Sequence, residues 1–380
     1  MSFLDLAIVC TAALAGPILA TPKGWRLPVV LGELVAGVVL GATGFGVLDA
    51  SEPTFSFLGS CGFVLVMFVA GTHVPVRDPR LRTALRTGVV RALLVGVVAV
   101  ALGYAVARLV GTSHALVYAV LMASSSAAIV LPTVDSLKLT GPDLVDLLPQ
   151  VAVADSLCIV LLPLVIDTAH VVRAAVGALA VLAAGVVLFG LLSWVERSGL
   201  RNRVHDESEE RGFAVELRVS LAAMFAMAAL AVAVHVSLML AGFVSGLAVA
   251  FVGEPRRVAK QLFAVTEGFF GPLFFVWLGA TLQLRNLVQH PSMIVLGVCL
   301  GAGAALAHLA AVLLRQPPAY AMLAAAQLGV PVAAATVGEQ LHVLRPGEGA
   351  SLVLGALLAL GVTVAGGALA ARRTPEPTGG

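Results

Sequence analysis

The chain has 380 residues, of which 59% are hydrophobic and only 12% are charged, and its formal net charge is +2. A soluble protein carries about 25% charged residues because water must wet its surface. This composition excludes an ordinary soluble domain and predicts an integral membrane protein, and the small net charge argues against a nucleic-acid partner.

Thirteen apolar stretches along the chain are candidate membrane spans. A spanning helix needs about 20 apolar residues. The first stretch lacks the basic lead of a secretory signal, so we expect it to remain as a spanning helix. The sequence therefore predicts an all-α polytopic membrane protein with about 13 transmembrane helices and no separate soluble domain. The stretches lie near residues 4–20, 27–43, 55–71, 88–110, 114–134, 147–166, 172–195, 215–234, 236–252, 261–281, 292–314, 318–339 and 349–370.

The distribution of Lys and Arg predicts the orientation of these spans, because loops on the cytoplasmic side carry an excess of positive charge. An odd number of spans places the two termini on opposite sides. With the N-terminus outside and the C-terminus in the cytoplasm, 19 of the 23 Lys and Arg residues fall in inside loops. The polar loop 197–211 carries mixed charges and is expected to be a solvated linker.

Two segments of similar sequence indicate an internal repeat. The third span reads CGFVLVMFVAGTHVPVRD (61–78), and the tenth reads GPLFFVWLGATLQLRN (271–286). The predicted orientation gives them opposite directions across the membrane. Similar units in opposite directions are typical of the inverted-topology repeats of secondary transporters.

The fifth and twelfth spans, each two spans after one of the similar segments, combine polar residues with a helix breaker. We predict that both are discontinuous, crossing helices, whose free backbone groups can line an ion site. The alternative is close packing of small residues beside a harmless proline kink. The residues concerned are Ser124, Ser125, Ser126 and Pro132 in the fifth span and Gln327, Gly329 and Pro331 in the twelfth.

Asp155 is the ionisable residue expected to lie farthest from both membrane faces. It stands nine residues after Asp146 and twelve before Asp167 in an otherwise apolar stretch. An acid at the bilayer centre costs roughly 2.5–3.5 kcal/mol, so such a residue is a functional candidate by default. The other acids and bases of the spans are expected to reach water near span ends: Glu33, Arg91, Asp146, Asp167, Glu216 and Glu339.

The expected position of Asp155 suits ion exchange. Burial favours the neutral form of a carboxyl group, so Asp155 can hold a proton and release it when a small cation replaces it. Hard cations prefer oxygen ligands, which the hydroxyls of Ser124, Ser125, Ser126 and Ser156 would supply. The alternative is an Asp that stays protonated and hydrogen-bonded between helices. No cofactor is expected.

Several motifs together resemble those of bacterial monovalent cation:proton antiporters, the sodium/proton and potassium/proton exchangers. They are LPVVLGELVAGVVLG (27–41), GFVLVMFVAGTHV (62–74), ASSSAAIVLPTV (123–134), VAVADSLCIVLL (151–162), MLAGFVSGLAVA (239–250) and FFGPLFFVWLGATLQL (269–284). The resemblance implies exchange of Na⁺ or K⁺ for H⁺ at Asp155, elevator-type movement, a homodimer and a bacterial plasma membrane.

The resemblance also implies a division of the chain as one exchanger domain, residues 1–380. Scaffold and dimer helices would occupy about 1–87 and 215–290, and ion-transport core helices about 88–170 and 291–372. A linker helix and cytosolic loop would cover 171–214, and a short tail 373–380. Some potassium/proton relatives append a nucleotide-binding domain, and no Gly-rich phosphate loop follows here.

Two departures from the family pattern concern the charge at the site. The family usually has Asp, Asn or Gln before the essential Asp, whereas this chain has Ala154. Many relatives carry Lys or Arg in the eleventh span, where this chain offers only His308 as a possible counter-charge or pH sensor. The identity of the cation, the stoichiometry and the pH dependence of transport are therefore left open.

Because of these departures, we also consider other functions. A transport-inactive sensor or a passive channel of the same fold is one alternative, and a sodium-coupled symporter is another. An intramembrane enzyme is disfavoured, because the chain has no H-E-x-x-H motif and no second deep Asp to form a protease dyad.

Overall fold

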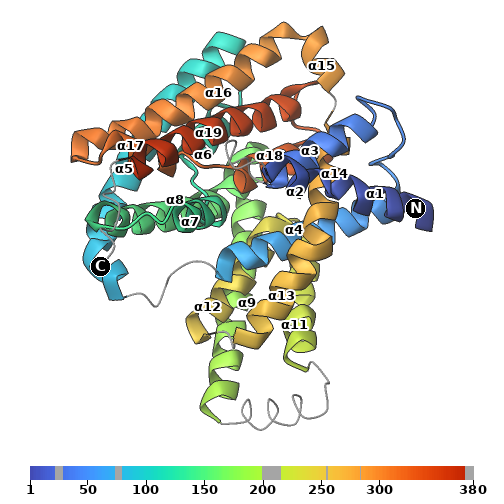
Figure 1. Ribbon diagram of the computed structural model, residues 1–380, viewed down its shortest axis with the longest axis horizontal. Coiled ribbons are helices and arrows are strands. Elements are labelled where there is room, and N and C mark those ends of the chain that lie inside the picture. Colours follow the sequence, from blue (N-terminus) through green and yellow to red (C-terminus); the bar gives the residue numbers. More distant parts are fainter. Residues whose placement is uncertain (22–28, 73–78, 199–214, 254–255, 283, 373–380) are drawn as a thin grey trace. The chain divides into compact units, whose positions relative to one another are not determined.

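The computed structural model describes residues 1–21, 29–72, 79–198, 215–253, 256–282 and 284–372, which form helices and no strand (Figure 1). Ten helices of this part are long and apolar enough to cross a membrane, and Val29–Leu40 and Leu238–Val252 are shorter apolar helices. The prediction of an all-α polytopic membrane protein is confirmed. Most of the loop 197–211, and the tail 373–380, lie outside the described residues.

The chain forms two compact units, each made of two separate stretches of sequence: residues 1–74 with 172–283, and residues 75–171 with 284–380. The first unit contains α1 (Phe3–Ala13), α2 (Ala15–Ala20), α3 (Val29–Leu40), α4 (Pro53–Thr72), α9 (Val171–Arg197), α11 (Val215–Ala233), α12 (Leu238–Val252), α13 (Arg256–Val265), the π-helical turn η2 (Thr266–Phe270) and α14 (Gly271–Thr281). The second contains α5 (Pro79–Val110), α6 (Ala115–Ala123), α7 (Ala127–Ser136), α8 (Pro142–Ile166), η1 (Thr168–His170), α15 (Leu284–Gln289), α16 (Pro291–Leu309), η3 (Ala310–Leu314), α17 (Pro318–Ala324), α18 (Gly329–Gln340) and α19 (Glu348–Ala371). Helix α9, expected as a separate linker, belongs to the first unit.

Glycines set the helix packing of the first unit. The backbones of α3 and α14 are in direct contact at Gly37. A Cβ at this position would clash with the carbonyl oxygen of Val276. A Cβ at Gly279 would in turn clash with the carbonyl of Leu34. Lipid tails are as apolar as Leu, so helices in a membrane associate through such close packing rather than through hydrophobic burial.

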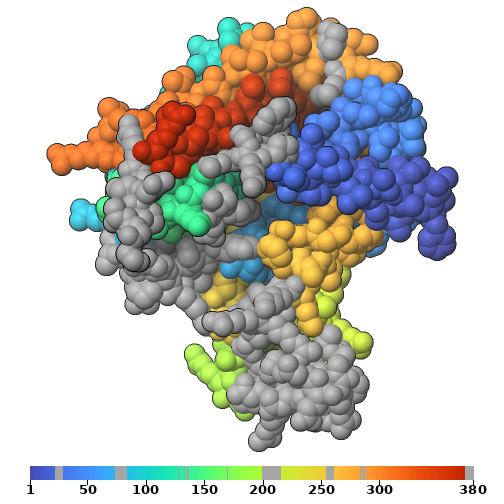
Figure 2. Space-filling view, in the orientation of Figure 1, coloured from blue at the N-terminus to red at the C-terminus, as the bar shows by residue number. Residues whose placement is uncertain are grey.

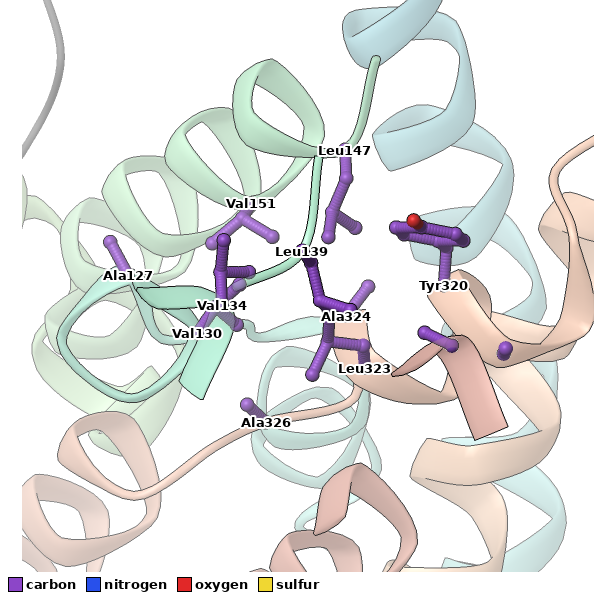
Figure 3. Packing of buried hydrophobic residues seen from close by; sticks show 12 residues of the cluster. Ala127, Val130, Val134, Leu139, Leu147, Val151, Tyr320, Leu323, Ala324 and Ala326 are labelled. Carbon is purple, nitrogen blue, oxygen red and sulfur yellow. The ribbon is translucent and has the colours of Figure 1, made fainter. Parts of the chain in front are cut away.

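In the second unit, α16 and α19 pack side by side and both reach the face of the molecule shown in Figure 2. A separate apolar cluster holds α7 against α8 and α17 (Figure 3). Its labelled members include Val130 on α7, Val151 on α8 and Leu323 on α17, all buried. This cluster fixes two interrupted regions of the chain, described below, beside α8.

Gly37→Ala should destabilise the first unit, because the added methyl group has no space against α14. We expect a lower melting temperature of the purified protein, corresponding to a loss of about 1–3 kcal/mol. Gly190→Ala is the matched control, since Gly190 lies in α9 of the same unit and its added Cβ would meet nothing within 4 Å. An equal melting temperature for the two variants would show that α3 and α14 do not pack this closely.

Candidate functional site

The fifth predicted span is interrupted at its centre. Helix α6 ends at Ala123 and α7 begins at Ala127, with Ser124 in an extended conformation (φ −68°, ψ 149°). The hydroxyl of Ser124 donates a hydrogen bond of 2.8 Å to the carbonyl oxygen of Leu121, which also accepts the backbone N–H of Ser124 at 3.1 Å. Serine favours such local hydrogen bonds over continuation of a helix, so the serine run accounts for the break.

The twelfth predicted span has a corresponding interruption between α17, which ends at Ala324, and α18, which begins at Gly329. Gln327 lies in this break and is buried. Pro331 is the third residue of α18, where a backbone N–H would have no partner within the helix, so proline is tolerated. Because proline has no N–H, the carbonyl of Gln327 receives no helical hydrogen bond from residue 331.

The two breaks contact each other within the second unit. The hydroxyl of Ser125 donates a hydrogen bond to the carbonyl oxygen of Ala324 at the end of α17, at 2.7 Å. The Ser124 hydroxyl lies 3.1 Å from Oε1 of Gln327. Ala127, Ala324 and Ala326 of these segments belong to the buried cluster drawn in Figure 3. Residues about 200 positions apart in the chain thus meet.

Asp155 lies on α8 and directs its carboxylate to the first break. Its Oδ2 accepts a hydrogen bond of 3.0 Å from the backbone N–H of Ala127, the first residue of α7. The side chain is buried, with the residue only 6% exposed. The N-terminus of a helix carries a partial positive charge, so α7 favours a negative or strongly polar group at this position.

The first break thus contains a buried carboxylate at the N-terminus of α7 and two serine hydroxyls that bond to the carbonyl oxygens of Leu121 and Ala324. Carboxylate, hydroxyl and carbonyl oxygens are the ligands that hard cations prefer.

The other predicted site residues have different positions. Ser126 is buried and its carbonyl accepts hydrogen bonds from the first turn of α7, while Ser156 is half-buried beside Asp155 on α8. Pro132 lies in the second turn of α7, so its expected place at the interruption is corrected: the serines form the break. His308 is buried, and its Nδ1 lies 3.0 Å from the carbonyl of Ala304 on its own helix. Within the described residues it forms no ion pair with Asp155.

The expectation that all other ionisable residues of the spans reach water is wrong for two of them. Glu33 is 4% exposed and Arg91 is 5% exposed. Both stand near span ends in the sequence, but neighbouring helices cover them. Position along a helix fixes depth, whereas coverage depends on helices that are distant in the chain.

A third buried acid, Glu348 at the start of α19, had no signal in the sequence. Its Oε1 lies 2.7 Å from Nδ1 of His114 and accepts a 2.5 Å hydrogen bond from the hydroxyl of Tyr118. Its Oε2 accepts the backbone N–H of Arg345 at 2.8 Å. These bonds fasten the beginning of α6 to the beginning of α19. The sequence Pro-Gly-Glu is typical of an exposed loop, and the side-chain partners of Glu348, His114 and Tyr118, lie more than 200 residues away.

Comparison with known proteins gives a consistent family relationship. The model of the family described as "Sodium/hydrogen exchanger, transmembrane" matches residues 9–371. YjbQ of Bacillus subtilis (strain 168) is 24% identical over 388 residues, which cover 94% of this chain and 61% of YjbQ. The glutathione-regulated potassium-efflux system protein KefC of Klebsiella pneumoniae (strain 342) is 29% identical over 290 residues, which cover 70% of this chain and 43% of KefC.

Among solved structures, the sodium proton antiporter MjNhaP1 from Methanocaldococcus jannaschii at pH 8 has a similar fold. The TM-score is 0.69 at 15% identity, over 97% of this chain and 98% of that structure. The alignments of YjbQ and KefC, by contrast, leave more than a third of each relative's length uncovered.

Replacing Pro331 tests the interruption of the twelfth span. Pro331→Ala supplies an N–H that can bond to the carbonyl of Gln327 and allow α17 and α18 to join. We expect slower turnover in transport with little loss of folded protein, because the oxygen atoms of this break are then withdrawn into a helix.

The control for this variant is Pro291→Ala at the first position of α16, which begins a continuous helix. Turnover of Pro331→Ala equal to that of wild type and of the control would show that the helix break does not depend on this residue.

Proposed function

The chain belongs to the sodium/hydrogen exchanger family, and on this basis we propose that it exchanges a monovalent cation, Na⁺ or K⁺, for H⁺ across a membrane. The proteins compared above are transporters, not enzymes: the name of MjNhaP1 describes a sodium proton antiporter and that of KefC a potassium-efflux system. These names support a small monovalent cation as the cargo and leave the choice between Na⁺ and K⁺ open.

The observation that carries the proposal is the hydrogen bond from the Ala127 N–H to Asp155. A buried carboxylate at the end of an interrupted helix can exist as a neutral acid or as an anion balanced by a cation. The helix terminus favours the anion, and burial favours the neutral acid. The two effects act in opposite directions, so neither form is favoured by both.

Proton and cation compete for the same carboxylate in this proposal. When Asp155 is protonated, a cation loses its charged ligand and leaves. When the proton departs, the cation binds Asp155 together with oxygens of the interrupted helices. Ser124 and Ser125 contribute hydroxyl oxygens, and Ser126 and Ser156 are further proposed ligands. Because only one of the two ions is held at a time, the fluxes of cation and proton are opposite in direction and coupled.

We further propose that the second unit, which contains Asp155 and both interrupted helices, carries the ion by an elevator-type movement. The first unit would form the scaffold and the contact of a homodimer. The excess of Lys and Arg in alternate loops supports an outside N-terminus and a cytoplasmic C-terminus. A bacterial plasma membrane and an inverted repeat relating α4 to α14 complete the proposal.

Transport by the purified chain in liposomes tests this function. A pH-sensitive dye inside vesicles that hold a pH gradient reports proton movement after Na⁺, K⁺ or Li⁺ is added outside. Exchange predicts that the gradient collapses only on addition of a transported cation. A gradient that persists with every cation would identify a transport-inactive sensor, and a collapse before any cation is added would identify a passive channel.

Asp155→Asn should abolish cation-dependent proton flux, because an amide can neither exchange a proton nor carry the negative charge that a cation requires. The melting temperature should change little, since the amide oxygen still accepts the N–H of Ala127. Asp143→Asn, at an exposed position in the first turn of the same helix α8, is the matched control and should transport normally. Exchange that survives in Asp155→Asn would remove this residue from the mechanism.

Ser125→Ala should weaken the apparent cation affinity more than it lowers the maximal rate. It removes one oxygen ligand proposed for the cation, together with the hydrogen bond to the carbonyl of Ala324. A lost polar contact with the ligand of about 0.5–1.5 kcal/mol corresponds to roughly 2- to 10-fold in affinity. Ser245→Ala is the control, because Ser245 is also buried and bonds to the carbonyl of Ala241 on its own helix in the first unit. Affinity unchanged in both variants would favour a packing role for the serine run.

A further inference from the structure

A group of polar side chains outside the two helix breaks joins the beginning of α6 to the beginning of α19 in the second unit. Glu348, the first residue of α19, is 0% exposed. Its Oε1 accepts a hydrogen bond from the hydroxyl of Tyr118 and lies 2.7 Å from Nδ1 of His114, and its Oε2 accepts the backbone N–H of Arg345. With the ring proton of His114 on Nδ1, both oxygens accept hydrogen bonds, which is the pattern of an ionised carboxylate.

Helix α6 depends on its neighbours for its position. It is nine residues long, and its N-cap residue, His114, makes no side-chain bond to the backbone of the first turn. A helix of this length is unstable on its own. His114 and Tyr118 stand four residues apart, and both bond to the same oxygen of Glu348. Two bonds from one turn of chain to one atom restrict both the rotation of α6 about its axis and its displacement along that axis.

The contacts of α6 with α5 and α16 are made at glycines. A Cβ at Gly103 of α5 would stand 2.5 Å from the carbonyl oxygen of Ala115, and one at Gly303 of α16 would stand 2.3 Å from Sδ of Met122. Such contacts bring helices close together, but each van der Waals contact is weak. A hydrogen bond has a preferred distance and angle, so the register of α6 depends chiefly on the hydrogen bonds at its ends.

Helix α19 connects Glu348 to the second break. It packs against α17 and α18, which flank the interruption at Gln327, whereas α6 and α19 make few other contacts with each other in the described part of the chain. At the far end of α6, about 13 Å along its axis, Ser125 bonds to Ala324 and Ser124 lies beside Gln327. Both ends of α6 are therefore joined to the same set of helices.

We propose that Glu348 is a positioning residue for the candidate ion site, a role that rests on the proposed function, and that it holds α6 in register with α17 and α18. The hydroxyls of Ser124 and Ser125, which follow the end of α6, then keep their places relative to the second break. A site is precise when the elements that carry its ligands are fixed by such supporting bonds. Glu348 acts through α6 and not by contact with the transported ion.

Deuterium uptake by backbone amides measures the hold on α6 without relying on transport. Glu348→Gln keeps the shape of the side chain, but an amide has a single acceptor oxygen and makes weaker hydrogen bonds than a carboxylate. In the purified full chain in detergent, the amides of residues 115–126 should take up deuterium roughly 2- to 10-fold faster than in wild type. This factor corresponds to the loss of one typical hydrogen bond.

Ser351→Ala is the matched control. Ser351 is 0% exposed, lies one turn after Glu348 on α19 and donates a hydrogen bond of 2.7 Å to the carbonyl oxygen of Met293 on α16. This variant loses a buried bond of the same helix and should leave deuterium uptake in α6 at the wild-type rate. Tyr118→Phe removes one donor to Glu348 with little change of shape and should act in the same direction as Glu348→Gln. Wild-type uptake in both of these variants would overturn the proposal.

The effect on the ion site has its own measurement in liposomes. Glu348→Gln should raise the cation concentration that gives half-maximal proton flux by roughly 2- to 10-fold, whereas Ser351→Ala should leave this concentration unchanged whatever its melting temperature. In a Ser125→Ala background the effect of Glu348→Gln should be smaller, because both changes act on the same proposed ligand and such effects are not additive.

An unchanged half-maximal concentration in Glu348→Gln, or an equally large effect in the Ser125→Ala background, would overturn the positioning role. A wild-type chain without cation-dependent flux would contradict the proposed function and with it this role. The deuterium uptake of α6 would still decide whether Glu348 holds that helix, so the two failures are distinguishable.

Discussion

The hydrogen bond from the N–H of Ala127 to Asp155 is the interaction on which the rest of the second unit depends. An intact helix would use that amide internally, so the bond exists only because the chain stops being helical at Ser124. The serine hydroxyls make this possible by bonding to carbonyls, one on the preceding helix and one at the end of α17. The side chains of two serines thereby allow the N-terminus of α7 to face a carboxylate that comes from another helix.

Close packing of small residues provides the frame for this arrangement. In a membrane the hydrophobic effect does not drive one helix against another, so glycine contacts determine which helices touch. Gly37 and Gly279 do this between α3 and α14, and Gly88 does it between α5 and α8. In the second unit the contact at Gly88 lies beside the backbone N of Gln150.

Much of this architecture was predictable from sequence, because spans follow from hydropathy and Asp155 stands out by its distance from both span ends. The serine run and Gln327 were also recognisable, since polar residues in mid-membrane need a reason to be there. What could not be predicted were pairings across 200 residues, such as Tyr118 with Glu348, and the burial of Glu33 and Arg91 near span ends. Pro132 was expected at the interruption but lies within α7. A proline removes one hydrogen bond of a helix, whereas the serine hydroxyls form several hydrogen bonds outside the helical pattern. The burial and the partners of a side chain depend on helices that are distant in the chain, and the hydropathy pattern of the sequence does not show which helices these are.

The carboxylate of Asp155, bonded to the start of α7, also has a consequence for leakage in the proposed exchange. A second unit with a proton or a monovalent ion at Asp155 would carry no net charge at that position, whereas an unloaded one would carry −1. Taking an uncompensated charge through hydrocarbon is costly, so under this proposal a vacant carrier would stay on the side where it last released its ion. Slippage, in which one ion runs down its gradient without the other being moved, would then be suppressed by electrostatics alone.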